Sequence, residues 1–349
     1  MTQMSKRQGL VRRRCMRSRL VSVAAAAWLC WPAAYAHHAF TANFDVGEIV
    51  EVEGRITALH WQNPHVLMTL VAPGGAEWQV ESQAKNLLER TEIEPGMFAP
   101  GTAVALAGYP ARQGNGIFAL NALLPDGREV ILRAGIASHF GGRSAGRPEN
   151  ILETGVADAG GSGIFRVWSM QFAGDGRWRW PDSYPLTPSA AEARDRFDPK
   201  ADNPLANCGT KGMPWIMEQP FPMELAMDGG DIVMRIEEDD AVRVIHMGAA
   251  PAAAVQPSPL GYSVGRWDGG DLVVETSAID YPYLNSTGIP LSGAVMLHER
   301  FSPVADGSRL SYRLTVTDPA NFTEPVTIES YWVWWPGERL QRYACVPEN

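Results

Sequence analysis

The feature that most constrains the fold is a recurring alternation of apolar and polar residues in short segments. Segments 48–56 and 309–317 show it clearly, although they lie far apart in the chain. A half-buried β-strand has this period of two, because successive side chains point to opposite faces of the sheet. Turn sequences such as Asp228-Gly229-Gly230 separate several of these segments. The pattern therefore predicts an all-β protein with only minor helix.

The first part of the chain has the element order of a small barrel. The expected elements are strands at 48–56, 66–71 and 77–81, a helix at 86–90, and strands at 102–107 and 116–121. Three strands, a helix and two strands is the order found in an OB-fold. We therefore expect an OB-like domain over residues 37–133.

A glycine-rich stretch marks the expected domain boundary. Residues 134–163 contain eight glycines and few apolar residues in a periodic pattern, which is typical of a flexible linker. Beyond it, strands are expected at 231–236, 241–247, 271–276, 295–301, 309–317 and 326–334. Sequential antiparallel strands predict a barrel or a sandwich over 164–349. A lipocalin-like barrel is the first choice.

The N-terminus has the three parts of a secretory signal. Seven basic residues and no acidic residue precede an apolar run at 20–31, and Ala34-Tyr35-Ala36 supplies small residues for cleavage. The apolar run is shorter than the roughly 20 residues that a spanning helix needs. The sequence predicts a signal peptide at 1–36, a periplasmic or secreted protein, and no membrane span in the mature chain.

The charge of the mature chain limits its partners. The full sequence has 30 Lys and Arg against 39 Asp and Glu, and seven of the basic residues precede His37, so the mature chain has 23 basic residues and a net charge of −16. This charge disfavours nucleic acid and anionic membrane surfaces. A metal or small-molecule ligand is compatible with it, and the sequence leaves the oligomeric state open.

The two cysteines that would remain after cleavage are expected to pair. Cys208 and Cys345 form an even number in an oxidising compartment, so we predict a disulfide between them. The alternative is two free thiols that bind a metal. The wide spacing, without a CxxC pattern, favours the disulfide.

Cleavage after Ala36 would place a free amine beside two imidazoles. His37 could then bind copper(II) through its amine and its ring, with His65 as the expected third nitrogen ligand and His60 and His38 as alternatives. Amine and imidazole nitrogens suit copper, which has the highest affinity in the divalent series. The competing interpretation is a disordered tail beside a surface histidine.

Aromatic residues of the second domain are candidates for a ligand pocket. Trp178 and Trp180 alternate, as do Trp332 and Trp334, and on strands each pair would face one side. The pairs either fill the barrel core or line a pocket for an apolar or sugar-like ligand. His246 and His298 are further candidates for this pocket. Residues 237–240, all acidic, are expected to form a solvated hairpin tip.

Three functions follow from these features. The leading hypothesis is an exported, non-catalytic binding protein of unknown ligand, with its pocket in the second domain. The second is a copper-binding accessory protein that uses the mature N-terminal His37. The third is a hydrolase or isomerase that uses His246 or His298.

Two sets of motifs resemble known secreted proteins. His37-His38-x-Phe40, Trp61-x-Asn63-Pro64-His65 and the sequence at 124–127 resemble an uncharacterised family of small secreted bacterial proteins. Asn207-Cys208, the segment 261–267 and Tyr343-Ala344-Cys345 resemble a β-rich region of hypothetical secreted bacterial proteins. The resemblance implies the domain layout and export, and it brings no activity.

Overall fold

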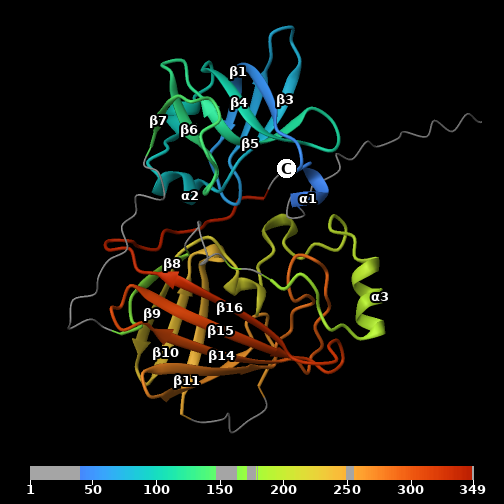
Figure 1. Ribbon diagram of the computed structural model, residues 1–349, viewed down its shortest axis with the longest axis vertical. Helices are drawn as coiled ribbons and strands as arrows, with labels where there is room; N and C mark the ends of the chain where they lie inside the picture. Colours follow the sequence, from blue (N-terminus) through green and yellow to red (C-terminus); the bar gives the residue numbers. More distant parts are fainter. Residues whose placement is uncertain (1–39, 147–162, 171–177, 179, 249–254, 348–349) are drawn as a thin grey trace, which may run out of the picture. The chain divides into compact units, whose positions relative to one another are not determined.

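The structure is a computed structural model that describes residues 40–146, 163–170, 178, 180–248 and 255–347 (Figure 1). The expected signal peptide, its cleavage site, His37 and His38 lie outside the described residues. Strands account for 42% of the described residues and helices for 12%, so the predicted all-β class is confirmed. Within the described part, none of the helices has the length and apolar character to cross a membrane.

The N-terminal barrel has the strand order of an OB-fold. Its elements are α1 (Phe40–Asn43), β1 (Val50–His60), β2 (Leu67–Val71), β3 (Glu77–Glu81), α2 (Lys85–Arg90), η1 (Pro95–Phe98), β4 (Ala103–Pro110) and β5 (Gly116–Leu123). β1 pairs antiparallel with both β2 and β4, and β3 pairs parallel with β5. The closed order β1-β2-β3-β5-β4, with a helix between β3 and β4, confirms the OB-like prediction.

Two further strands extend this sheet beyond β5. β6 (Arg128–Ile131) pairs antiparallel with β5, and β7 (Arg143–Ala145) pairs parallel with β6. Neither strand has a counterpart among the elements expected from the sequence. β7 lies inside the segment 134–163 that we expect to be a linker, and residues 147–162 of that segment lie outside the described residues.

The first barrel closes around alternating apolar side chains. Ile56, Leu70 and Leu106 are almost completely buried, as the alternation along β1, β2 and β4 predicts. Gly54 lies where β1 approaches its neighbour closely, since a Cβ there would come within 2.5 Å of the Val71 carbonyl oxygen. Glycine at this position therefore lets two paired strands pass at close range.

The C-terminal barrel is closed by nine strands. They are β8 (Val167–Met170), β9 (Met223–Asp228), β10 (Asp231–Ile236), β11 (Ala241–Met247), β12 (Tyr262–Asp268), β13 (Asp271–Ser277), β14 (Met296–Pro303), β15 (Arg309–Thr317) and β16 (Val326–Val333). β16 pairs with β8 and so closes the ring. The predicted antiparallel barrel is confirmed, with one parallel pair between β11 and β12. A lipocalin barrel has eight strands in an up-and-down order, so this barrel differs from it in strand number and in its parallel pair.

Packed side chains occupy the interior of this second barrel. Trp168, Phe301, Tyr312 and Trp332 are at most 2% exposed. The ring of Tyr312 lies 4.9 Å from that of Phe301 and 5.0 Å from that of Trp332. These aromatic contacts add to the hydrophobic contribution of burial. Side chains of the chain itself therefore fill the described interior of the C-terminal barrel.

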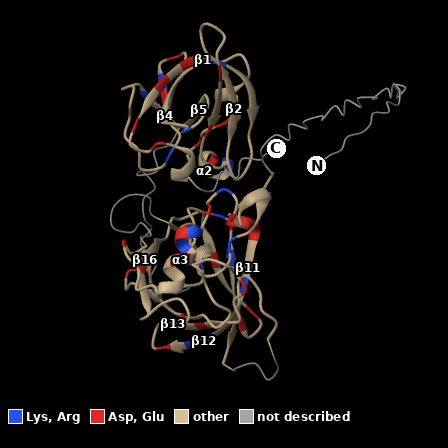
Figure 2. Ribbon diagram, turned by 90° about the vertical axis from the view of Figure 1, so that its right-hand side faces the viewer, with Lys and Arg blue, Asp and Glu red and all other residues tan. Residues whose placement is uncertain are grey.

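Short helices lie in the connections of the second barrel. They are α3 (Pro188–Arg196), η4 (Ala206–Cys208), η5 (Trp215–Met217) and η6 (Glu238–Asp240). α3 carries both acidic and basic residues (Figure 2). It begins after Thr187, whose hydroxyl accepts a hydrogen bond from the Ala190 N–H, and Pro188 occupies its first turn.

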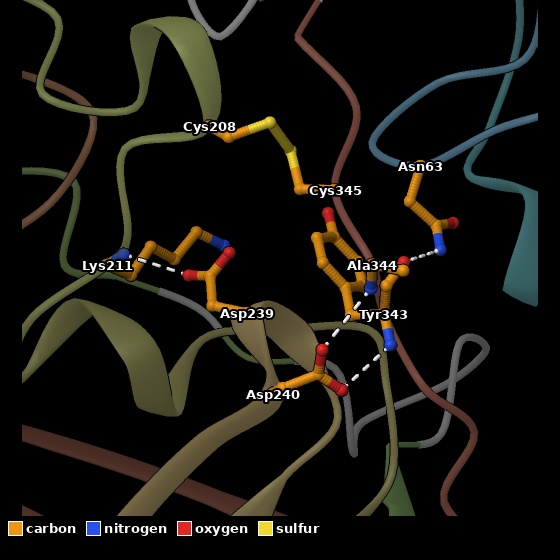
Figure 3. Close-up of a disulfide and its surroundings, with 8 residues drawn as sticks. All are labelled: Asn63, Cys208, Lys211, Asp239, Asp240, Tyr343, Ala344 and Cys345. Carbon is orange, nitrogen blue, oxygen red and sulfur yellow. Dashed lines mark hydrogen bonds between the residues drawn. A yellow bond between two sulfur atoms is a disulfide. The ribbon is translucent and has the colours of Figure 1, made fainter.

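The predicted Cys208–Cys345 disulfide is present (Figure 3). It links η4 to the C-terminal segment across 137 positions of sequence. That segment is red in Figure 1 and passes close to α2, where the Asn86 side-chain amide donates to the Arg342 carbonyl at 3.2 Å. The end of the chain therefore contacts residues of both barrels.

Candidate ligand-binding site

A cavity of about 730 Å³, called the central cavity below, is lined by residues of both barrels. Its polar and charged lining comprises Thr41, His65, Gln83, Arg133, Lys211, Glu218, Gln219, Glu238 and Ser286. Its apolar and aromatic lining includes Phe40, Leu87, Phe118, Met170, Trp178, Leu205, Trp215 and Tyr343. Such a mixture is typical of a site that binds a small organic molecule.

Trp178 lines the part of the cavity wall that the C-terminal barrel supplies, and Trp180 packs against Trp178. Their rings are 5.5 Å apart, and that of Trp178 also lies 5.7 Å from Tyr312 of β15. The Trp180 indole N–H donates to the Glu218 carboxylate. Both residues lie outside any strand, so the expected strand alternation is wrong for this pair. The alternating stretch contains only one pair of tryptophans, between Gly176 and Pro181, and is too short to form a β-strand.

A buried ion pair forms the charged part of this wall. Lys211 Nζ lies 2.9 Å from Glu238 Oε1, and it donates to the Glu218 carbonyl at 3.3 Å. The Lys211 backbone N–H donates to Asp239 at 2.9 Å (Figure 3). Burial raises the pKa of Glu238 to about 7, although the charge of Lys211 acts in the opposite direction. Burial also raises the pKa of Asp239. This part of the cavity therefore changes charge near neutral pH.

His65 is the one predicted metal ligand that lines the cavity within the described residues. Its Nδ1 lies 3.1 Å from Glu81 Oε1. His60, at the end of β1, is exposed and does not line the cavity. The described residues contain no group of three or more His, Cys, Asp or Glu side chains placed to hold a metal ion. A copper site at His65 would therefore need ligands from outside the described residues.

The structure separates the two histidines that we considered for a pocket or for catalysis. His246 on β11 lies on the outer side of the barrel, where its Nδ1 is 2.8 Å from Asp231 Oδ2 and its ring stacks on Tyr262. His298 on β14 is exposed. β12 and β13 lie between their strands, and neither histidine lines the central cavity.

The second pair of predicted tryptophans divides between the core and the barrel rim. Trp332 is completely buried on β16, and Trp334 follows the end of that strand. The Arg166 guanidinium lies 4.5 Å from the Trp334 ring. Neither tryptophan lines the central cavity. Of the four predicted tryptophans, Trp178 alone contributes to its lining.

A polar cluster that the sequence analysis missed is enclosed in the C-terminal barrel. Arg243 of β11 forms a bidentate pair with Glu299 of β14, and it also donates to Ser263 at 2.9 Å and to Thr276 at 2.7 Å. The Tyr312 hydroxyl donates to Glu299 at 2.8 Å. Burial and the neighbouring carboxylate raise the pKa of Tyr312 well above its ordinary value. The charged groups satisfy one another, as buried charges require.

The strand alternation does contain a signal for this cluster. Arg243 is two residues from buried Ile245, and Glu299 lies midway between buried Leu297 and Phe301. On a strand, residues two apart face the same side. One buried basic and one buried acidic residue at inward positions indicate an ion pair inside the barrel. The pairing itself depends on the strand order, which the alternation does not specify.

The acidic run at 237–240 forms a second group of buried polar contacts. Glu237 is 1% exposed, and it accepts hydrogen bonds from Asn86 at 2.9 Å and from Arg90 Nη1 at 2.7 Å. Burial alone would lower the pKa of Arg90, but the hydrogen bond and charge of Glu237 raise it. Asp240 accepts from the Tyr343 N–H at 2.8 Å (Figure 3). The expectation of a solvated hairpin tip is therefore wrong.

Asn63 of the Asn-Pro-His motif joins the same group of contacts. Its side-chain amide donates to Asn86 Oδ1 at 2.9 Å and to the Tyr343 carbonyl, and its own carbonyl accepts from the Val346 N–H at 2.9 Å. Asn63 thus binds the C-terminal segment, while the neighbouring His65 lines the cavity.

Comparison with known proteins gives a partial match. A family of unknown function (DUF6152) matches residues 21–118, which cover α1, the five strands of the N-terminal barrel up to the first part of β5, and α2. No curated protein and no solved structure matches the chain. The N-terminal part of the chain is therefore similar to an uncharacterised family.

Proposed function

We propose that this chain is an exported, non-catalytic binding protein whose small-molecule ligand occupies the central cavity. The observation that carries the proposal is the cavity itself. Its volume of about 730 Å³ lies within the range of roughly 300–1,000 Å³ that is usual for ligand sites. Its lining combines tryptophan rings with a few charged and amide side chains, as such sites do.

Two features support export. The sequence 1–36 has the order of a signal peptide. The Cys208–Cys345 disulfide suits an oxidising compartment such as the bacterial periplasm. We therefore propose that the protein is periplasmic or secreted and begins at His37.

The proposed pocket differs in place from the one that the tryptophan pattern favours. The interior of the C-terminal barrel is filled by Trp168, Phe301, Tyr312 and Trp332. The cavity lies outside that core and is lined by both barrels. A ligand there would contact Trp178 but not Trp332.

A neutral fluorescent probe, N-phenyl-1-naphthylamine, tests for an accessible apolar site. We expect saturable binding with one site per chain. Ser286→Trp should abolish most of it, because Ser286 is exposed and lines the cavity, so that a bulky ring there would occupy part of the cavity. Ala294→Trp is the matched control, since Ala294 is exposed on the same connection and does not line the cavity. Equal binding by both variants, or no saturable binding by the parent, would contradict the proposal.

A copper site at the mature N-terminus is the second candidate, and one observation favours it. Phe40 and His65 line the same cavity. Cleavage after Ala36 would leave the new amine three residues before Phe40, and three extended residues span at most about 11 Å. The His37 amine would then lie within about 11 Å of Phe40, which lines the same cavity as His65.

Copper(II) titration against a competing chelator tests this candidate. We expect tight binding by the processed protein and weaker binding by His65→Ala. An additional N-terminal residue should remove most of the affinity, because it blocks the amine of the chelate while every side chain remains. His246→Ala is the control and should bind like the parent. Equal affinity in all four proteins would exclude the N-terminal site.

No observation favours the hydrolase or isomerase alternative over these two. His246 and His298 lie on different strands, outside the central cavity. We therefore make no catalytic proposal.

A further inference from the structure

We propose that the ligand of the central cavity is an uncharged molecule with an apolar ring body and a carbonyl-type acceptor, which receives hydrogen bonds from Trp178 and Gln219. This inference rests on the proposed function, because it names the class of ligand for the same site. It is carried by two buried donors, by the charge of the wall around them and by the apolar surface beside them.

Two buried N–H groups in the cavity wall lack an acceptor. Trp178 is 5% exposed and Gln219 is 1% exposed, and both line the cavity. Among the described residues, neither Trp178 Nε1 nor Gln219 Nε2 has a hydrogen-bond partner. A buried donor without an acceptor destabilises the folded state by the desolvation cost of the group. An acceptor on a ligand would remove that cost.

The orientation of the Gln219 amide is fixed by its neighbour. Gln219 Oε1 accepts a hydrogen bond from the Phe221 backbone N–H at 2.7 Å. The NH₂ end, which can only donate, is therefore the end without a partner. The Gln219 side chain is thus held as a donor.

The two donors belong to the same part of the wall. The Trp178 ring contacts the Trp180 ring at 5.5 Å. Trp180 in turn donates to the carboxylate of Glu218, which precedes Gln219 in the chain. One acceptor group, such as a carbonyl with two lone pairs, suits two donors held in one region.

The charges of this region disfavour an anionic ligand. Glu218 and Glu238 line the cavity there, and Asp239 contacts the backbone of Lys211. Among the described residues beside Trp178 and Gln219, Lys211 is the cation, and its ammonium group is already bound to Glu238. Arg133 lines another part of the cavity, where its guanidinium lies over the Phe40 and Phe118 rings. A negatively charged ligand beside Trp178 and Gln219 would therefore face described carboxylates and a lysine that is already paired. A neutral acceptor avoids this repulsion.

Apolar surface beside the donors suits a ring. Met170, Leu205 and Trp215 line the cavity together with Trp178, and all four are at most 7% exposed. Buried aromatic faces favour a flat, apolar ligand body. The donors would then determine how that body is oriented.

Three naphthalene probes test the inference on the full processed chain. Prodan is uncharged and has a ketone, N-phenyl-1-naphthylamine is uncharged and has no carbonyl, and 1-anilinonaphthalene-8-sulfonate is anionic. We expect prodan to bind most tightly, with emission shifted to the red by hydrogen bonds to its ketone. Trp178→Phe and Gln219→Leu should each weaken prodan binding about tenfold, the usual effect of one hydrogen bond, and shift its emission to the blue.

The controls separate this inference from the proposed function. Trp332 also has a buried indole N–H that finds no partner in the described part of the chain, but it does not line the cavity, so Trp332→Phe should leave prodan binding unchanged. Binding of N-phenyl-1-naphthylamine should persist in the Trp178 and Gln219 variants, which also shows that they fold. The inference is wrong if the variants weaken the two uncharged probes equally or not at all, or if the sulfonate binds most tightly. The proposed function itself fails if no probe binds saturably.

Discussion

At the scale of single residues, the protonation of Glu238 makes the stability of the protein depend on pH. Burial raises the pKa of its carboxyl to about 7, whereas an unfolded glutamate has a pKa of about 4.3. The folded state therefore binds this proton more tightly than the unfolded state does. The free energy of unfolding should therefore decrease as pH rises from about 4.3 to 7. Above pH 7, Glu238 should cause no further change.

We expect the Glu238→Gln variant to lose this part of the pH dependence. A raised pKa of this size corresponds to about 3–4 kcal/mol between the two ends of the range. Urea unfolding of the parent and the variant between pH 4.5 and 8 measures it. Glu324→Gln is the control, because Glu324 is exposed. If the curves of the parent and Glu238→Gln run parallel, Glu238 does not titrate as the structure indicates.

At the scale of elements, the C-terminal segment joins several parts of the chain. Its backbone hydrogen-bonds to Asn86. It also hydrogen-bonds to Asn63 and Asp240, and Cys345 bonds to Cys208 in η4 (Figure 3). The segment itself has little regular structure. Its position therefore depends on side-chain contacts and on the disulfide.

Removal of the disulfide should destabilise the protein by about 4 kcal/mol, since the bond closes a loop of 137 positions. Cys208→Ser combined with Cys345→Ser tests this without leaving a free thiol. Denaturant unfolding of parent and variant gives the difference, and non-reducing peptide mapping verifies the link in the parent. Two alkylatable thiols in native exported protein would contradict the assignment.

At the scale of the whole molecule, buried polar groups connect the two barrels. Arg90 and Asn86 of α2 bind Glu237, which precedes η6 in the C-terminal barrel. The Arg90 side chain is 9% exposed and that of Glu237 is completely buried. The glycine-rich linker expected at 134–163 predicts that residues 164–349 fold separately. Such a fragment would leave Glu237 without these two partners.

Arg90→Ala in the full chain should therefore lower the free energy of unfolding by about 3–5 kcal/mol, because it leaves a buried carboxylate unpaired. Adding Glu237→Gln to that variant should recover part of the loss, since the remaining group is uncharged. Arg339→Ala is the control at an exposed arginine of the C-terminal segment. A loss of less than 1 kcal/mol in Arg90→Ala would show that the contact contributes little.

The sequence by itself determined the approximate positions of eleven of the sixteen strands that the structure describes. The strands at 77–81, 231–236, 241–247 and 309–317 have the predicted bounds, because a period of two is a local property of the chain. The OB-like element order follows from local patterns, and the Cys208–Cys345 pair follows from the count of two cysteines after residue 36. β8, β9 and β12 of the C-terminal barrel were not predicted as strands; the four residues of β8 show too few alternations.

Only the tertiary structure decided which distant residues meet. The parallel pairing of β3 with β5, the closure of β16 on β8 and the Arg243–Glu299 pair join positions whose separation no periodicity encodes. The same holds for the acidic run at 237–240, which is typical of a solvated turn until α2 and the C-terminal segment cover it. The central cavity exists because two separately patterned barrels leave space between side chains of both. Strand positions are local, whereas burial and binding sites depend on long-range contacts.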